Sequence, residues 1–204
     1  MSTVRRVPPN FFSIPFGVAG LAMVWRLAGQ VYGVPVWIGD AVFVMAAAAW
    51  AILVVIYAGC AVIDPASVAC HLRDPVLAPF LSLAALVGML LAAGLEDTAR
   101  TAGIVLFAAS LAAATLFGGW AMGQLRVAGM NAGRLHSGYF LPTVAGGLIA
   151  ASGAAMAGLP QLGWVCFGVG VLSWVMLSSV ILGRLISRPR PPAAWSSRKR
   201  HTLP

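Results

Sequence analysis

The feature that most constrains this chain is a series of long stretches without a single charged side chain. They cover residues 7–25, 41–63, 75–95, 101–125 and 135–183. An α-helix of about 20 residues crosses about 30 Å of hydrocarbon, so each of the first four stretches is long enough for one membrane span and the fifth for two. Charged residues make up 9% of the 204, against about 25% in soluble domains, which excludes a water-soluble fold. The sequence predicts an all-α integral membrane protein.

The longest stretch divides in two at residues 158–163. Pro160 and the glycines on either side of it favour a turn there, because proline and paired glycines end helices. We therefore expect six transmembrane helices. Their expected ranges are residues 10–28, 37–63, 77–95, 99–126, 140–158 and 162–186.

The distribution of Lys and Arg orients these helices. If the N-terminus is cytoplasmic, the outer segments hold only Arg26 and Arg100, and the other eleven of the 13 cations lie on the cytoplasmic side. Those eleven are Arg5, Arg6, Arg73, Arg126, Arg134, Arg184, Arg188, Arg190, Arg198, Lys199 and Arg200. Because short cytoplasmic loops are enriched in Lys and Arg, we expect both termini in the cytoplasm and the chain in the cell (inner) membrane. The cations lie between apolar stretches and do not line one face of a domain, so the expected partner is the lipid bilayer and not nucleic acid.

Residues 1–30 also allow a second interpretation, a cleaved signal peptide, since Arg5 and Arg6 precede an apolar run. The Pro8-Pro9 pair, Pro15 and the lack of a clear small-residue cleavage site favour a retained helix instead. We expect the first span to stay in the protein.

The sequence has few residues that could carry out catalysis. It contains no H-E-x-x-H, G-x-S-x-G, phosphate-binding loop or C-x-x-C motif, so no enzyme activity is expected. The three histidines fall in predicted cytoplasmic segments, where solvated loop positions are the simplest interpretation, and the three cysteines lack ligand spacing. They are His71, His136, His201, Cys60, Cys70 and Cys166. Neither a metal nor another cofactor is expected.

No acidic residue lies well inside a predicted span. Proton-coupled carriers hold a titratable group at membrane depth, so a proton relay is not expected here. A path through these helices would be lined by backbone dipoles, hydroxyls and apolar side chains, which permits the passage of anions. We expect this passage to be independent of voltage.

Prolines occur on alternate spans. Pro15, Pro79 and Pro142 lie in the first, third and fifth, while the interiors of the second, fourth and sixth have none. Because proline removes a backbone donor and bends a helix, the pattern suggests three hairpins, each with a bent inner helix and a straight outer one. Small residues stand close to two of these prolines, namely Ser13, Gly17 and Gly20 near the first and Thr143, Gly146 and Gly147 near the third. The alternative interpretation of the glycines is that they only let helices pack closely.

Four blocks in this order resemble a known family. The first is residues 12–22 (FSIPFGVAGLA) followed by Trp25-Arg26. The second is Arg73-Asp74-Pro75-Val76 with Phe80, and the third is residues 138–145 (GYFLPTVA). The fourth comprises Gly168-Val169-Gly170, Ser173-Trp174, Val180-Ile181 and Arg184-Leu185. Together they resemble the TehA and plant slow-type anion channel family, also called the tellurite-resistance/dicarboxylate transporter family.

The resemblance implies a fold and a function. Members of this family have ten helices, arranged as five hairpins around a pore, with the odd-numbered helices inside and a phenylalanine of the ninth helix occluding the pore. Characterised members form homotrimers with one pore per subunit and move small anions such as chloride, sulfite, malate or tellurite-like oxyanions. The resemblance makes this chain the first three hairpins of that fold. The candidate pore-lining residues are Ser13, Pro15, Gly17, Pro79, Phe80, Pro142, Thr143 and Gly146.

The resemblance covers residues 8–187 and stops before a basic, proline-rich segment, 188–204. We expect this segment to be a disordered cytoplasmic tail. One hypothesis is a truncated or frame-shifted copy whose last segment is read in a foreign frame. The alternative is a natural short form whose basic tail touches anionic lipid. Transmembrane transport is the expected function, and a non-transporting membrane subunit or inactive fragment is the alternative. An intramembrane enzyme is disfavoured, because no nucleophile and base pair stands at membrane depth.

Overall fold

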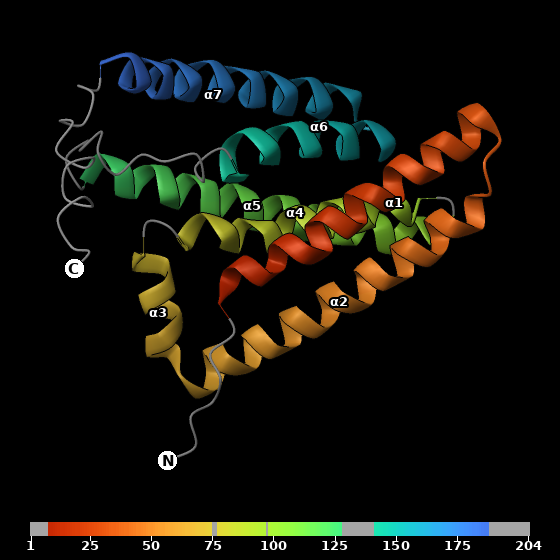
Figure 1. Cartoon of the computed structure of the whole chain (residues 1–204), viewed down its shortest axis with the longest axis horizontal. Helices are drawn as coiled ribbons and strands as arrows, with labels where there is room; N and C mark the ends of the chain where they lie inside the picture. Colours follow the sequence, from red (N-terminus) through yellow and green to blue (C-terminus); the bar gives the residue numbers. More distant parts are fainter. Residues whose placement is uncertain (1–7, 75–76, 97, 128–140, 188–204) are drawn as a thin grey trace, which may run out of the picture.

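The computed structural model describes residues 8–74, 77–96, 98–127 and 141–187. All the secondary structure in these ranges is helical (Figure 1). In chain order the elements are a 3₁₀ turn η1 (Pro9–Phe12), α1 (Ser13–Tyr32), α2 (Val36–Ile63), α3 (Pro65–Arg73), α4 (Ala78–Gly94), α5 (Arg100–Val127), a π-helical turn η4 (Leu141–Ala145), α6 (Gly146–Met156) and α7 (Pro160–Ser187).

Four of these segments are long and apolar enough to cross a membrane: Pro9–Tyr32, Val36–Ile63, Arg100–Ala121 and Pro160–Gly183. Two shorter apolar helices, Ala78–Gly94 and Leu141–Met156, lie where the third and fifth spans were expected. The prediction of an all-α membrane bundle is confirmed. That the two shorter helices also cross the membrane stays a prediction.

One helix was not predicted. The nine residues of α3 follow α2 directly, in a segment expected to be a loop. The Asp64 carboxylate accepts a hydrogen bond from the Ser67 backbone N–H at 3.2 Å, and Pro65 occupies the first helical position. A capping acid followed by proline is a normal helix start, so the local signal was present in the sequence.

The helices pack most extensively as three consecutive hairpins, α1–α2, α4–α5 and α6–α7. Two of the hairpin turns use a glycine with positive φ, Gly33 at +71° and Gly158 at +79°. Side chains are rarely tolerated in this backbone conformation, so these turns depend on glycine. Figure 1 shows α4–α5 between the other two hairpins.

Helix α4 is the centre of the bundle. It contacts α1, α2, α5 and α6 as well as both short turns, and it buries large side chains including Leu83, Leu86, Val87 and Met89. The first helices of the three hairpins therefore form one row, α1–α4–α6, with α4 in the middle. These are the three helices that were expected to be the inner ones; that they face a pore stays a prediction.

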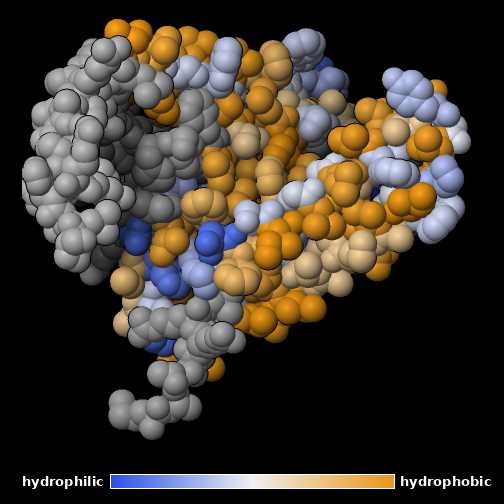
Figure 2. All heavy atoms as spheres, viewed as in Figure 1, coloured by the Kyte–Doolittle hydropathy of each residue, from blue (hydrophilic) through white to orange (hydrophobic). Residues whose placement is uncertain are grey.

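The outward faces of the long helices are strongly apolar. In α2 and α7 only 11% and 6% of the most apolar stretch is buried inside the protein. Figure 2 shows apolar surface spread over these helices. Apolar surface of this extent requires a non-aqueous environment, so the chain is a multi-pass membrane protein.

Candidate transport pathway

The starts of the three helices of the row, α1, α4 and α6, lie at one end of the bundle (Figure 1). Both short turns, η1 before α1 and η4 before α6, pack against α4. Phe12 of η1 and Leu141 of η4 join the same apolar cluster as Phe80 and Leu83 of α4. The fold thus gathers most of the candidate pore-lining residues, which are far apart in sequence, at this starting end of the row.

The prolines shape the backbone at this end. Pro15 is in the first turn of α1, directly after the 3₁₀ turn, and Pro142 lies in the π-helical turn that leads into α6. Pro79 is the second residue of α4. The N–H groups of the first four residues of a helix have no partner within the helix, so a proline at this position removes no helical hydrogen bond. The bend expected at Pro79 is therefore absent, and this proline begins the helix instead. All three prolines are buried, so they contribute backbone geometry and not side-chain surface.

The other candidates differ in exposure. Ser13 and Gly17 are exposed on α1, Phe80 and Thr143 are half-buried, and Gly146 is buried. The Ser13 hydroxyl donates a hydrogen bond to the Asn10 carbonyl at 2.7 Å. A Cβ added at Gly17 would meet no atom within 4 Å, so one side of α1 is open at this position.

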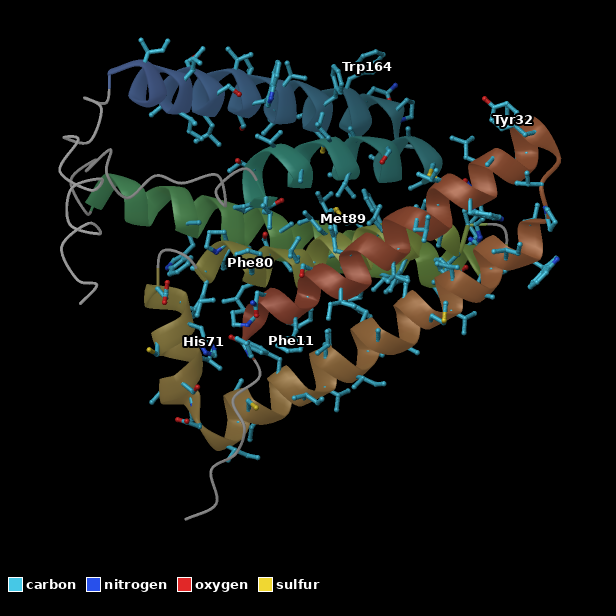
Figure 3. All side chains as sticks on the ribbon, viewed as in Figure 1. Phe11, Tyr32, His71, Phe80, Met89 and Trp164 are labelled. Atoms are coloured by element: carbon cyan, nitrogen blue, oxygen red, sulfur yellow. The ribbon has the colours of Figure 1, made fainter. Side chains whose placement is uncertain are left out.

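A polar and aromatic contact links the starting end to α3. The Tyr57 hydroxyl and His71 Nδ1 share a hydrogen bond at 3.1 Å, and their rings stack with centroids 6.1 Å apart. Tyr57 also meets the Phe12 ring edge-on at 6.0 Å. Figure 3 places His71 on α3, and its half-buried position corrects the expectation of a solvated loop histidine. The other two histidines, His136 and His201, lie outside the described residues.

An arginine holds the opposite end of the row together. The Arg26 guanidinium pairs with the Asp40 carboxylate at 2.8 Å, and its Nη1 donates to the Gly94 carbonyl at 2.8 Å. The guanidinium also lies 4.4 Å from the centre of the Phe43 ring. Arg26 thus ties α1 to the start of α2 and the end of α4. The sequence alone placed Arg26 only in an outer segment, although opposite charges at the facing ends of two successive spans were a usable signal.

The polar groups between these ends bond within the protein. The Ser82 hydroxyl donates to the Pro79 carbonyl at 2.6 Å, and the Ser152 hydroxyl donates to the Ile149 carbonyl at 2.9 Å. Within the described ranges, no buried side-chain nitrogen or oxygen lacks a partner, and no three potential metal ligands cluster. A passage beside these helices would be uncharged along its middle.

Comparison with known proteins gives two matches. The family model described as voltage-dependent anion channel (SLAC1) matches residues 6–196, and its match ends inside the basic segment 188–204. A tellurite resistance protein TehA homolog from Haemophilus influenzae is 26% identical over 180 residues, which are 88% of this chain and 55% of that protein. The chain therefore spans about half the length of the curated relative that it matches.

Proposed function

The chain belongs to the voltage-dependent anion channel family, and from this premise we propose that it takes part in moving small anions across the membrane. One observation carries the proposal. The proline-bearing first helices of three successive hairpins stand side by side as the row α1–α4–α6, with their starts gathered at one end. A row of this kind forms part of the wall of a path between helices.

The chemistry of the row suits anions that cross without being bound by a charged side chain of the protein. The exposed Ser13 and the open side of α1 at Gly17 leave room beside the backbone, and no carboxylate of the described residues lies at mid-depth to repel an anion. Selectivity would then depend on pore width and on backbone and hydroxyl dipoles. Chloride, sulfite, malate and tellurite are the anions that we propose for it.

Flux in liposomes tests the proposal. We expect the reconstituted full chain to carry at least one of these four anions, and Gly17→Phe to reduce the flux to that of empty liposomes by filling the open side of α1. Gly168→Phe is the matched control, because a Cβ at Gly168 of α7 also meets nothing within 4 Å but lies outside the row. Equal flux in the two variants would exclude a path along α1. Absence of flux from the unmodified chain at every protein density would reject autonomous transport.

The same liposomes test voltage dependence. Moving one charge through the membrane potential contributes about 2.3 kcal/mol per 100 mV, so steep gating requires charges at depth. Among the described residues of the row, the charge is confined to its ends. We therefore propose that flux, corrected for driving force, does not change with clamped voltage. A steep change of open probability would contradict this.

A second function, a non-transporting membrane subunit, is favoured by the open side of α1. Gly17 and Gly20 have no neighbour within 4 Å of a Cβ position, and Leu21 and Val24 are more than half exposed. A subunit of this kind would show no flux alone and would co-purify with a longer protein of the same family. Flux from the purified chain would exclude it.

We also propose a homotrimer in the inner membrane with both termini in the cytoplasm. Cross-linking in liposomes is expected to give a three-chain product, and a product limited to single chains would contradict the trimer. Proteolysis of inside-out vesicles is expected to remove the basic segment 188–204, supported by the concentration of Lys and Arg there. Cleavage of this segment only in right-side-out vesicles would reverse the proposed orientation.

A further inference from the structure

A hollow lies between the second helices of the first two hairpins, α2 and α5. Helices α2 and α5 both pack on α4 but do not pack closely on each other. Between them is an open cavity of about 400 Å³ with α4 as its floor. We call it the α2–α5 groove. The residues that matter for its chemistry are Trp50, Ala84, Ala109, Ser110, Ala113 and Phe117.

The walls of the α2–α5 groove offer few hydrogen-bonding groups, because two of the three polar side chains that line it, Trp50, Ser82 and Ser110, are bonded to backbone carbonyls. The Trp50 indole N–H donates to the Ala84 carbonyl at 2.8 Å, and the Ser82 hydroxyl donates to the Pro79 carbonyl at 2.6 Å. The remaining lining is almost entirely aliphatic and aromatic. Apolar cavities exclude water, and an anion would find no cation among the lining residues.

The groove lies at mid-depth in the membrane. Trp50 is at the middle of α2, Ala84 is near the middle of α4, and Ala113 is at the middle of α5. Since α2 and α5 are long enough to span the bilayer, lipid headgroups stay at the helix ends. The surrounding medium at this depth is hydrocarbon.

The groove is elongated along α5. Its lining on this helix runs from Leu106 to Phe117, which at 1.5 Å per residue is about 16 Å, close to the about 15 Å of hydrocarbon in one leaflet. An extended acyl chain can contact the lining over this whole length.

From these dimensions and this lining, we propose that the α2–α5 groove binds one acyl chain of a bilayer lipid. An empty groove would leave its lining atoms without van der Waals partners on one side, and a hydrocarbon chain supplies them. The groove lining includes none of the candidate pore-lining residues, and the proposal does not depend on whether the chain transports anions.

Quenching of Trp50 by brominated lipid tests this proposal on the full chain in liposomes. The Trp50 signal is the difference in fluorescence between the unmodified chain and Trp50→Phe, measured in the same lipid. We expect acyl chains brominated near the methyl end to quench this signal more strongly than chains brominated near the headgroup. Ala113→Phe fills the groove, and we expect this variant to lose the Trp50 quenching.

Ala108→Phe is the matched control. It makes the same substitution on the same helix at an exposed residue outside the groove lining, so the quenching is expected to persist. Ala109→Leu, a smaller filling substitution, replaces Ala113→Phe if the latter loses its helical circular dichroism. Quenching that is unchanged in the filled variants would overturn the proposal. Quenching of Trp50 by aqueous iodide instead of brominated lipid would also overturn it, because it indicates water in the groove. Quenching by neither reagent would overturn it too, because it indicates that another protein chain covers Trp50.

Discussion

Helices α4 and α7 are both strongly apolar in sequence, yet the protein uses them in opposite ways. Eleven of the 17 residues of α4 are buried, among them Leu83, Leu86 and Met89. In α7 the only buried residues among those described are Gly163 and Gly170. The large side chains of α4 interlock with its neighbours. Helix α7 turns most of its large side chains outward, packs Leu162 and Cys166 against the core, and brings its backbone close to α6 at Gly163 and Gly170.

The difference shows that apolar character does not identify the core of a membrane protein. Lipid is as apolar as leucine, so the hydrophobic effect does not sort these helices into inner and outer ones. Close packing sorts them instead. Where α6 and α7 cross, a Cβ added at Gly147 would lie 2.7 Å from the Gly170 Cα, which shows how closely the two backbones approach.

The largest effect that would sharpen this comparison is the loss of a large side chain from α4. Leu86 is fully buried, and we expect Leu86→Ala to destabilise the protein by about 2 kcal/mol. This loss is near the low end for such substitutions, because the side chain is in hydrocarbon and not in water when the chain unfolds in lipid. Leu172→Ala on α7 is the matched control, 65% exposed, with an expected change below about 0.5 kcal/mol. Unfolding in mixed micelles with increasing SDS measures both. Equal losses would mean that α4 and α7 are packed alike.

A second, slightly smaller effect is expected at the seam of α6 and α7. Gly147→Ala places a Cβ against backbone atoms of Gly170 and Cys166 that cannot rotate away, so we expect destabilisation of about 1–2 kcal/mol. Gly168→Ala on the same seam's outer helix has nothing within 4 Å and is expected to be neutral or slightly stabilising, since alanine favours helix. The same unfolding titration compares them. A neutral Gly147→Ala would show that α7 is not held by this close approach.

Much of this fold was predictable because hydrocarbon leaves the backbone so few choices. A chain in lipid must satisfy its hydrogen bonds internally, so a charge-free stretch becomes a helix of nearly the same bounds. The span expected at residues 37–63 is observed as Val36–Ile63, and the one expected at 162–186 lies within Pro160–Ser187. Helix α3 was missed because nine residues of mixed polarity do not form an apolar stretch, although Asp64 and Pro65 marked its start.

The candidate site was less predictable, because its geometry depends on contacts between distant segments. The alternation of prolines predicted which three helices belong together, but not that Pro79 starts its helix or that Pro15, Pro79 and Pro142 are buried. The α2–α5 groove has no signal in the sequence, since its walls come from three helices. The pairing of Tyr57 with His71 likewise required the position of α3.

The smallest effect concerns how the end of α4 is held, and it separates two roles of Arg26. If the ion pair with Asp40 were its main contact, Asp40→Asn and Arg26→Met would destabilise the protein alike. Asp40 is 53% exposed, and exposed pairs contribute about 0.2–1 kcal/mol, so we expect about 0.5 kcal/mol for Asp40→Asn. Arg26→Met also removes the hydrogen bond to the Gly94 carbonyl at the C-terminal end of α4 and the contact with the Phe43 ring, and we expect it to destabilise the protein by about 1 kcal/mol.

High salt should reduce the loss of stability in Asp40→Asn and leave most of the loss in Arg26→Met, because screening acts on the exposed ion pair. Equal losses of stability in the two variants, both abolished by high salt, would mean that Arg26 acts only through a surface ion pair. The end of α4 would then be held by apolar packing alone.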